Sequence, residues 1–269
     1  MKFVLLSILV LVLSLFIAIG ITILLNIAFK KKINVFLNIA IIIIIFLVVL
    51  GLSFYGYFMN PAKASEKAND YLVSSEEVSV TKIDYGYYFD GSGEDDLLIF
   101  YPGARVEKEA YAPLMFELAK NGVDTIIVEM LMNFPVLGKY KANKIIDDYD
   151  YKNYYISGHS LGGIMAGELA AKNDNIRGVI FMAAYPTKKL DANVRVLSLY
   201  GSNDKVLSMD QYDKNKKNFP SDYKELVING GNHSQFGSYG NQSGDGKADI
   251  TFEEQQEIIV NEIINFIVL

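Results

Sequence analysis

The chain has no cysteine and no tryptophan among its 269 residues. Without cysteine there can be no disulfide, no thiolate nucleophile and no cysteine-ligated metal. Histidine is almost as scarce, because only His159 and His233 are present. Any chemistry that needs an imidazole as its base must therefore use one of these two side chains.

Negative charge is missing from the first part of the chain, where no Asp or Glu precedes Glu66. Five of the 25 basic residues precede Ser65, so residues 65–269 hold 20 basic and 31 acidic side chains, a net charge of −11. Nucleic acids bind basic surfaces, so this balance argues against a nucleic-acid partner.

Two long uncharged stretches occupy the first sixty residues, at about 3–29 and 33–59. A helix of either length rises roughly 40 Å, more than the ~30 Å hydrocarbon core of a bilayer. A helix hairpin inside a soluble core would show one apolar stripe and not an apolar surface all round. Residues 1–60 are therefore predicted to form two transmembrane helices in a lipid bilayer.

The three lysines at 30–32 separate these stretches and predict the orientation. Basic turns stay on the cytoplasmic side, so both termini and the rest of the chain are expected outside the cytoplasm. A signal peptide over residues 1–29 is the alternative, but its apolar stretch is too long and lysines follow it. Ala62-Lys63-Ala64 resembles a processing site, although we favour its interpretation as part of a linker.

Residues 61–77 are predicted as a juxtamembrane linker, and residues 78–269 as one domain of alternating strands and helices. This alternation favours an α/β fold with a mostly parallel sheet covered on both faces. Strands are expected at 78–89 (an antiparallel entry strand), 97–101, 125–128, 154–156, 178–182, 194–200 and 225–228, and helices at 110–120, 139–149, 161–172, 209–218 and 252–266.

Gly158-His159-Ser160-Leu161-Gly162 matches the G-x-S-x-G pattern, between a predicted strand and a predicted helix. In this context the pattern is typical of a nucleophile elbow, in which a serine stands on a sharp turn. The flanking glycines avoid collisions, and the Leu161 N–H at the helix start points at a developing oxyanion. Ser160 is thus the candidate nucleophile.

A serine hydroxyl needs a base and an acidic residue that orients the base. His159 lies inside the elbow and is expected to pack beneath it, which leaves His233 as the base. The acidic residue should follow a strand between Ser160 and His233, where Asp204 is the favoured candidate. The other candidates are Asp191, Asp210, Asp213, Asp222 and Glu225.

A second oxyanion donor is expected from the loop after an early strand. Gly103 allows close approach there, and the Ala104 N–H is the candidate donor. Arg105 is one of three arginines and is a candidate for binding a substrate anion, although a surface role is as plausible. Residues 241–246 partly match a calcium loop, but position twelve is Phe252 and not Glu, so no metal and no cofactor are expected.

Residues 78–269 resemble the compact bacterial α/β hydrolases related to dienelactone hydrolases, including a branch of membrane-associated members. The matching segments are Phe100–Gly103, Gly158–Gly163, Gly201–Asp204 and Gly230–Gly237. The resemblance implies the α/β-hydrolase fold and a triad of Ser160, Asp204 and His233. Serine replaces the cysteine of dienelactone hydrolases, so a lactone substrate does not carry over.

Together these features predict a membrane-anchored serine hydrolase that acts on a small-molecule ester or other acyl substrate. An amidase, a thioesterase or an acyltransferase would use the same triad. A surface binding protein without turnover is the alternative from another class.

Overall fold

The computed structural model describes residues 2–28 and 34–268, which divide into two compact units, Met1–Asn60 and Pro61–Leu269. The first unit contains α1 (Lys2–Ala28) and α2 (Val35–Phe58). Ile8–Ala28 and Val35–Phe58 are long and apolar enough to cross a membrane. Asn26 Nδ2 donates to Asn38 Oδ1 at 3.0 Å, a polar contact between two mostly apolar helices. The basic turn at 30–32, on which the predicted orientation depends, lies outside the described residues.

The second unit is built on one sheet, in which the described residues form eight strands in the order β1-β2-β4-β3-β5-β6-β7-β8. Only β2 runs against its neighbours, and the pairs from β4 to β8 are parallel. The strands are β1 (Ser79–Ile83), β2 (Gly86–Asp90), β3 (Asp96–Tyr101), β4 (Asp124–Val128), β5 (Asn153–His159), β6 (Ile176–Met182), β7 (Arg195–Gly201) and β8 (Lys224–Ile228).

The single entry strand predicted at 78–89 is wrong, because this segment is a hairpin of β1 and β2. The chain reverses before Gly86, whose φ of 143° is accessible to glycine alone. A β-carbon at Gly86 would lie 1.9 Å from the carbonyl oxygen of Ile127, so glycine also allows β2 to pair with β4. Alternation in the sequence did not show this reversal, since both strands carry the same residue types.

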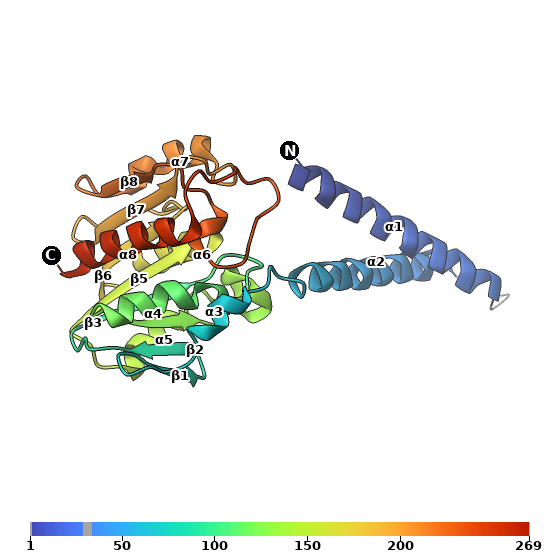
Figure 1. Ribbon diagram of the computed structural model, residues 1–269. Coiled ribbons are helices and arrows are strands. Elements are labelled where there is room, and N and C mark those ends of the chain that lie inside the picture. The colour runs from blue at the N-terminus through green and yellow to red at the C-terminus, as the bar shows by residue number, and fades with distance from the viewer. Residues whose placement is uncertain (1, 29–33, 269) are drawn as a thin grey trace. The chain divides into compact units, whose positions relative to one another are not determined.

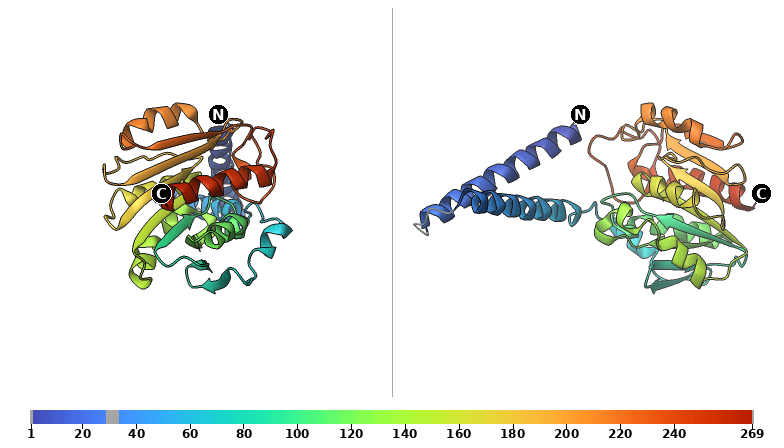
Figure 2. Two further views of the ribbon diagram at one scale, coloured as in Figure 1. Left: turned by 60° about the vertical axis from the view of Figure 1, so that its left-hand side comes forward. Right: turned by 180° about the vertical axis from the view of Figure 1, so that it is seen from behind.

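Helices cover both faces of the sheet (Figures 1 and 2), so the predicted α/β architecture is confirmed. The buried side chains of α4 (Ala112–Lys120) and α8 (Phe252–Val268) pack with Leu98 and Phe100 of β3. Those of α5 (Lys141–Asp148), α6 (Leu161–Ala170) and α7 (Met209–Asn215) belong to a second core cluster that contains Leu97, Ile99 and Tyr101 on the other face. Strand β3 is apolar on both faces because both are covered, as in parallel sheets generally.

The segment predicted as a linker is bound to the second unit. The Ala62 N–H donates to the carbonyl oxygen of Arg105 at 2.7 Å, and the Glu107 N–H donates to that of Ala62 at 3.0 Å. Ala62 and Val106 thereby form a parallel β-bridge. The short helix α3 (Glu66–Asp70) follows, and its Ala68 is completely buried. The sequence did not reveal this, because the contacts are made by backbone groups.

Candidate active site

Ser160 stands between β5 and α6, on a backbone with φ 54° and ψ −124°. A non-glycine residue rarely adopts a positive φ, and such strain persists only where surrounding contacts enforce it. The Ser160 N–H donates to the carbonyl oxygen of Met182 on the neighbouring strand at 2.9 Å, which holds the turn. The backbone therefore has the sharp strand-to-helix bend that the sequence pattern predicts.

Close packing around the turn explains its glycines. A β-carbon at Gly158 would lie 2.5 Å from the carbonyl carbon of Gly162. A β-carbon at Gly162 would lie 2.2 Å from the carbonyl oxygen of Tyr101. In both cases the obstructing atom belongs to the backbone and cannot move aside. Any larger residue at either position would force β3, β5 and α6 apart.

Asp204 and His233 contact each other beyond the carboxyl ends of β7 and β8. Oδ2 of Asp204 lies 2.8 Å from Nδ1 of His233, and both side chains are almost completely buried. Oδ1 of the same carboxylate accepts the N–H groups of Val206 and Leu207, each at 2.8 Å. A carboxylate held in this way fixes both the orientation and the tautomer of an imidazole.

The acidic residues that the sequence left as alternatives lie elsewhere. Glu225 accepts hydrogen bonds from the hydroxyls of Tyr212 and Tyr223. The remaining four are exposed on turns or helix surfaces: Asp191, Asp210, Asp213 and Asp222. Asp204 is the one among these candidates that the structure brings to His233.

The loop that carries His233 is clamped by α8. Oε1 of Gln255 accepts the Asn232 N–H, and Nε2 of Gln255 donates to the Asn232 carbonyl, both at 3.0 Å. Gln255 is fully buried, so this pair of bonds is protected from water. The clamp fixes the backbone of the residue just before the imidazole.

Asp245 connects the two loops that hold the acid–imidazole pair. Its Oδ2 accepts the Ser234 N–H at 2.8 Å, and its Oδ1 accepts the Lys205 N–H at 3.2 Å. Asp245 lies in the segment that partly matches a calcium loop in the sequence, and this role was not predicted for it. No sequence signal could have found it, because both partners are backbone groups of distant loops.

His159 is buried beneath the turn, as the sequence analysis expects. Its ring centroid lies 4.4 Å from that of His233, and its ring stacks on Phe236 at 5.5 Å. Burial, followed by the nearby His233, lowers the pKa of His159 well below its usual range. A neutral His159 can therefore pack against the His233 ring without charge repulsion.

Tyr111 links this buried histidine to the loop after β3. Its hydroxyl accepts the Gly103 N–H at 3.1 Å and lies 2.9 Å from Nδ1 of His159. A β-carbon at Gly103 would lie 2.9 Å from that hydroxyl, so glycine is needed for the contact. Tyr111 was not singled out from the sequence, because an aromatic residue near a helix start is usually part of the core.

Two backbone N–H groups near Ser160 are unpaired within the part of the chain that the structure describes. Leu161 is the first residue of α6, where N–H groups have no partner inside the helix. The Ala104 N–H likewise has no hydrogen-bond partner among these residues. Both match the positions predicted for oxyanion donors, and their role stays a prediction.

Arg105 follows in the same loop with a left-handed backbone (φ 59°), and its N–H donates to the carbonyl oxygen of Asn133 at 2.8 Å. This bond joins the loop after β3 to the segment after β4. The suggested binding of a substrate anion by Arg105 stays a prediction. In residues 2–28 and 34–268, no group of three or more His, Asp or Glu side chains is placed to hold a metal ion.

Residues 97–257 match the model of the Alpha/beta hydrolase family. The chain belongs to this family. The matched range covers more than half of the chain and includes Ser160, Asp204 and His233. The family membership predicted from the sequence is thereby confirmed, whereas the dienelactone-hydrolase-like branch stays a prediction. No match was found among curated protein sequences.

Solved structures of other α/β hydrolases resemble this one. Est1E from Butyrivibrio proteoclasticus is 16% identical, with a TM-score of 0.51, over 72% of this chain and 100% of that one. Mouse alpha/beta hydrolase domain-containing protein 10 is 13% identical, with a TM-score of 0.52, over 71% and 98%. A serine hydrolase involved in carbazole degradation, the CarC enzyme, is 11% identical, with a TM-score of 0.53, over 71% and 99%. At these identities the likeness extends to the fold alone.

Proposed function

We propose that the protein is a membrane-anchored serine hydrolase that cleaves carboxylic esters, with Ser160, Asp204 and His233 as its triad. The observation that carries this proposal is the buried 2.8 Å contact between Asp204 and His233, whose ring packs on the residue next to Ser160. An acid–imidazole pair beside a serine on a strained turn is the arrangement that activates a hydroxyl.

In the proposed first step, His233 accepts the Ser160 proton while the serine oxygen attacks the ester carbonyl. The carbonyl oxygen becomes an oxyanion, and the N–H groups of Leu161 and Ala104 are the donors that would stabilise it. His233 then gives its proton to the alcohol as the C–O bond breaks, which leaves an acyl group on Ser160. Water releases this acyl group by the same steps, with His233 again the base.

The membrane anchor in this proposal is supported by α1 and α2. Ile8–Ala28 and Val35–Phe58 contain no charged residue, and apolar side chains such as Leu24 and Phe36 are exposed. Exposed aliphatic and aromatic side chains on this scale are stable in lipid and aggregate in water. The predicted orientation would place the catalytic domain outside the cytoplasm.

One experiment tests both parts of the proposal. Cell membranes that contain the full chain are washed with alkaline carbonate and then treated with a fluorophosphonate probe. We expect the probe to label a protein of the full mass in the membrane pellet. The Ser160→Ala variant should lose the label, while Ser243→Ala, an exposed loop serine, should keep it.

The two parts can fail separately in this experiment. Full-length chain released into the supernatant would contradict the anchor, and a shortened chain there would favour the signal-peptide alternative. Absence of label on a folded protein in the pellet would contradict the hydrolase and favour a binding protein on the same fold.

Tyr111→Phe is expected to lower kcat about tenfold and to change KM little. The variant should disturb the loop that carries Ala104, and an oxyanion donor such as the Ala104 N–H acts mainly in the transition state. The change leaves the Gly103 N–H and the His159 Nδ1 buried without their partner, which frees the loop that carries Ala104. Steady-state kinetics with an activated ester would measure the effect.

Tyr155→Phe is the matched control for this prediction, since Tyr155 is equally buried but its hydroxyl makes only 3.5 Å contacts. Both variants should still unfold cooperatively, and only Tyr111→Phe should lose kcat. Equal kcat values in the two variants would show that Tyr111 contributes to packing and does not position the loop that carries Ala104.

A further inference from the structure

Apolar side chains are exposed on the segment after β4, which contains the 3-10 helices η2 (Leu131–Asn133) and η3 (Pro135–Gly138). The exposed fraction is 61% for Leu131, 50% for Leu137, 49% for Tyr140 and 39% for Val136. Scattered single apolar residues on a surface need no explanation, but a run of four within ten residues does.

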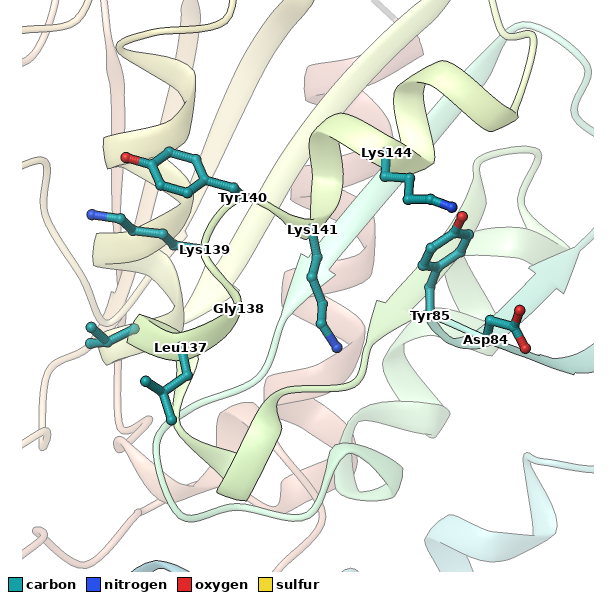
Figure 3. A pocket seen from close by; sticks show the side chains of 9 residues that line it. Asp84, Tyr85, Leu137, Gly138, Lys139, Tyr140, Lys141 and Lys144 are labelled. Carbon is teal, nitrogen blue, oxygen red and sulfur yellow. The ribbon is translucent and has the colours of Figure 1, made fainter.

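Positive charge accompanies this run. Residues 130–146 contain Lys139, Lys141 and Lys144 and no acidic residue, although residues 65–269 carry a net charge of −11. Within the chain, Lys139 pairs with Glu168 at 3.2 Å, Lys141 donates to the carbonyl oxygen of Glu129 at 2.7 Å, and Lys144 lies 3.7 Å from Asp148. Such pairs at a protein surface are weak, so lipid phosphates can compete for these lysines. The lysines line a shallow pocket of about 500 Å³ together with Leu137 and Tyr85 (Figure 3). Lys144 points toward Tyr85, whereas Lys139 and Tyr140 project to the other side of the segment. Apolar side chains interleaved with lysines are the composition that binds anionic lipid interfaces.

The segment lies on the same edge of the sheet as Ser160. It follows the carboxyl end of β4, the loop of Gly103 follows that of β3, and Ser160 follows that of β5. These three strands are neighbours in the sheet. The bond from the Arg105 N–H to Asn133 joins the first two of these loops directly. A surface that binds this segment would therefore also face the candidate active site.

The chain enters the domain at this edge as well. Ala62 is bridged to Val106, and the Ala64 N–H donates to Glu107 Oε2 at 2.9 Å, so the entry point is fixed. Only three residues separate Ala62 from Phe58, the last residue of the second candidate span. Such a stretch reaches at most about 14 Å, whatever angle it takes. The covalent connection alone therefore keeps the last residue of that span within this distance of Ala62.

We propose that residues 131–144 form a docking surface for the anionic bilayer in which the chain is anchored. Leu131, Leu137 and Tyr140 insert at the interface, and the lysines contact lipid phosphates. This proposal rests on the membrane anchor proposed above and narrows the substrate class to acyl esters carried by the membrane. A substrate dissolved in water would gain nothing from an active-site edge turned toward lipid.

The absence of cysteine makes a direct test practical, because one introduced cysteine can be labelled alone. The full chain carrying Leu137→Cys is labelled with an environment-sensitive fluorophore in single-copy nanodiscs with about 30% phosphatidylglycerol. Asp174→Cys is the control, since Asp174 is exposed in the turn before β6, at the opposite edge of the sheet. Both variants should unfold at the temperature of the parent chain.

At position 137 we expect a blue-shifted emission that spin-labelled lipids quench about twofold or more, and at position 174 almost no quenching. Quenching at position 137 should weaken in nanodiscs of phosphatidylcholine alone, because the lysines lose their anionic lipid partners.

Equal quenching at the two positions would overturn the docking surface. A blue shift in detergent that grows with protein concentration would show instead that a second copy covers the segment. Fluorophosphonate labelling of Ser160 is read separately, so failure of the docking surface and failure of the hydrolase remain distinguishable.

Discussion

His233→Ala is expected to lower the kcat of ester hydrolysis by about 10⁴–10⁶-fold, because loss of one member of a triad removes nearly all its catalytic effect. The imidazole is the base for Ser160 and the acid for the leaving alcohol, and His159 cannot replace it. His159 is fully buried, and its Nδ1 is engaged with Tyr111. Activity that remains would come from oxyanion stabilisation and substrate binding alone.

Addition of free imidazole distinguishes a lost base from a damaged fold. The alanine variant leaves a space beside Asp204 in which imidazole can bind, so its activity should rise with imidazole concentration. A Ser160→Ala variant should show no such rescue, since its nucleophile is gone. If His233→Ala kept most of the parent activity without imidazole, His233 would not be the base.

Asp204→Asn is expected to lower kcat by about 10³–10⁴-fold while the protein stays folded. In asparagine an NH2 group replaces the oxygen that faces His233 Nδ1. This group donates a hydrogen bond instead of accepting one, which favours the wrong tautomer of the ring. The asparagine oxygen can still accept the N–H groups of Val206 and Leu207, so the loop should keep its shape. The loss should appear in kcat, with KM little changed.

Asp222→Asn is the matched control, because Asp222 was a rival for the acidic position and is exposed on a turn before β8. It should keep the parent kcat. Equal kcat values for Asp204→Asn and Asp222→Asn would remove Asp204 from the triad. A large loss in Asp222→Asn alone would mean that the acid reaches His233 from another loop.

Much of the fold was predictable because its signals are local. Strands such as β3 and β4 are short apolar runs, as buried parallel strands require, and helices with one apolar face separate them. The turn at Ser160 was predictable for the same reason, since the small residues that it needs lie within two positions of the serine. The β1–β2 hairpin was missed because residues of the same types occur in both strands and on both sides of the reversal at Gly86.

Other parts of the candidate site were not predictable, because they depend on backbone groups that come together only in the folded chain. Gln255 and Asp245 hold the His233 loop through N–H and C=O groups, which every residue has. Tyr111 contacts Gly103 and His159 across 8 and 48 positions of sequence. A residue type alone cannot indicate such a partner.

The sequence by itself determined the two apolar helices, the α/β class of the domain and the serine on its turn, because each follows from the order of neighbouring residues. It also reduced the choice of base to His233, since the only other imidazole belongs to the turn. Only the tertiary structure decided between Asp204 and its rivals, because the sheet order places the ends of β7 and β8 side by side. The tertiary structure alone also decided that Ala62 is bridged to the loop after β3, because pairing between backbone groups depends on their distance and not on their side chains.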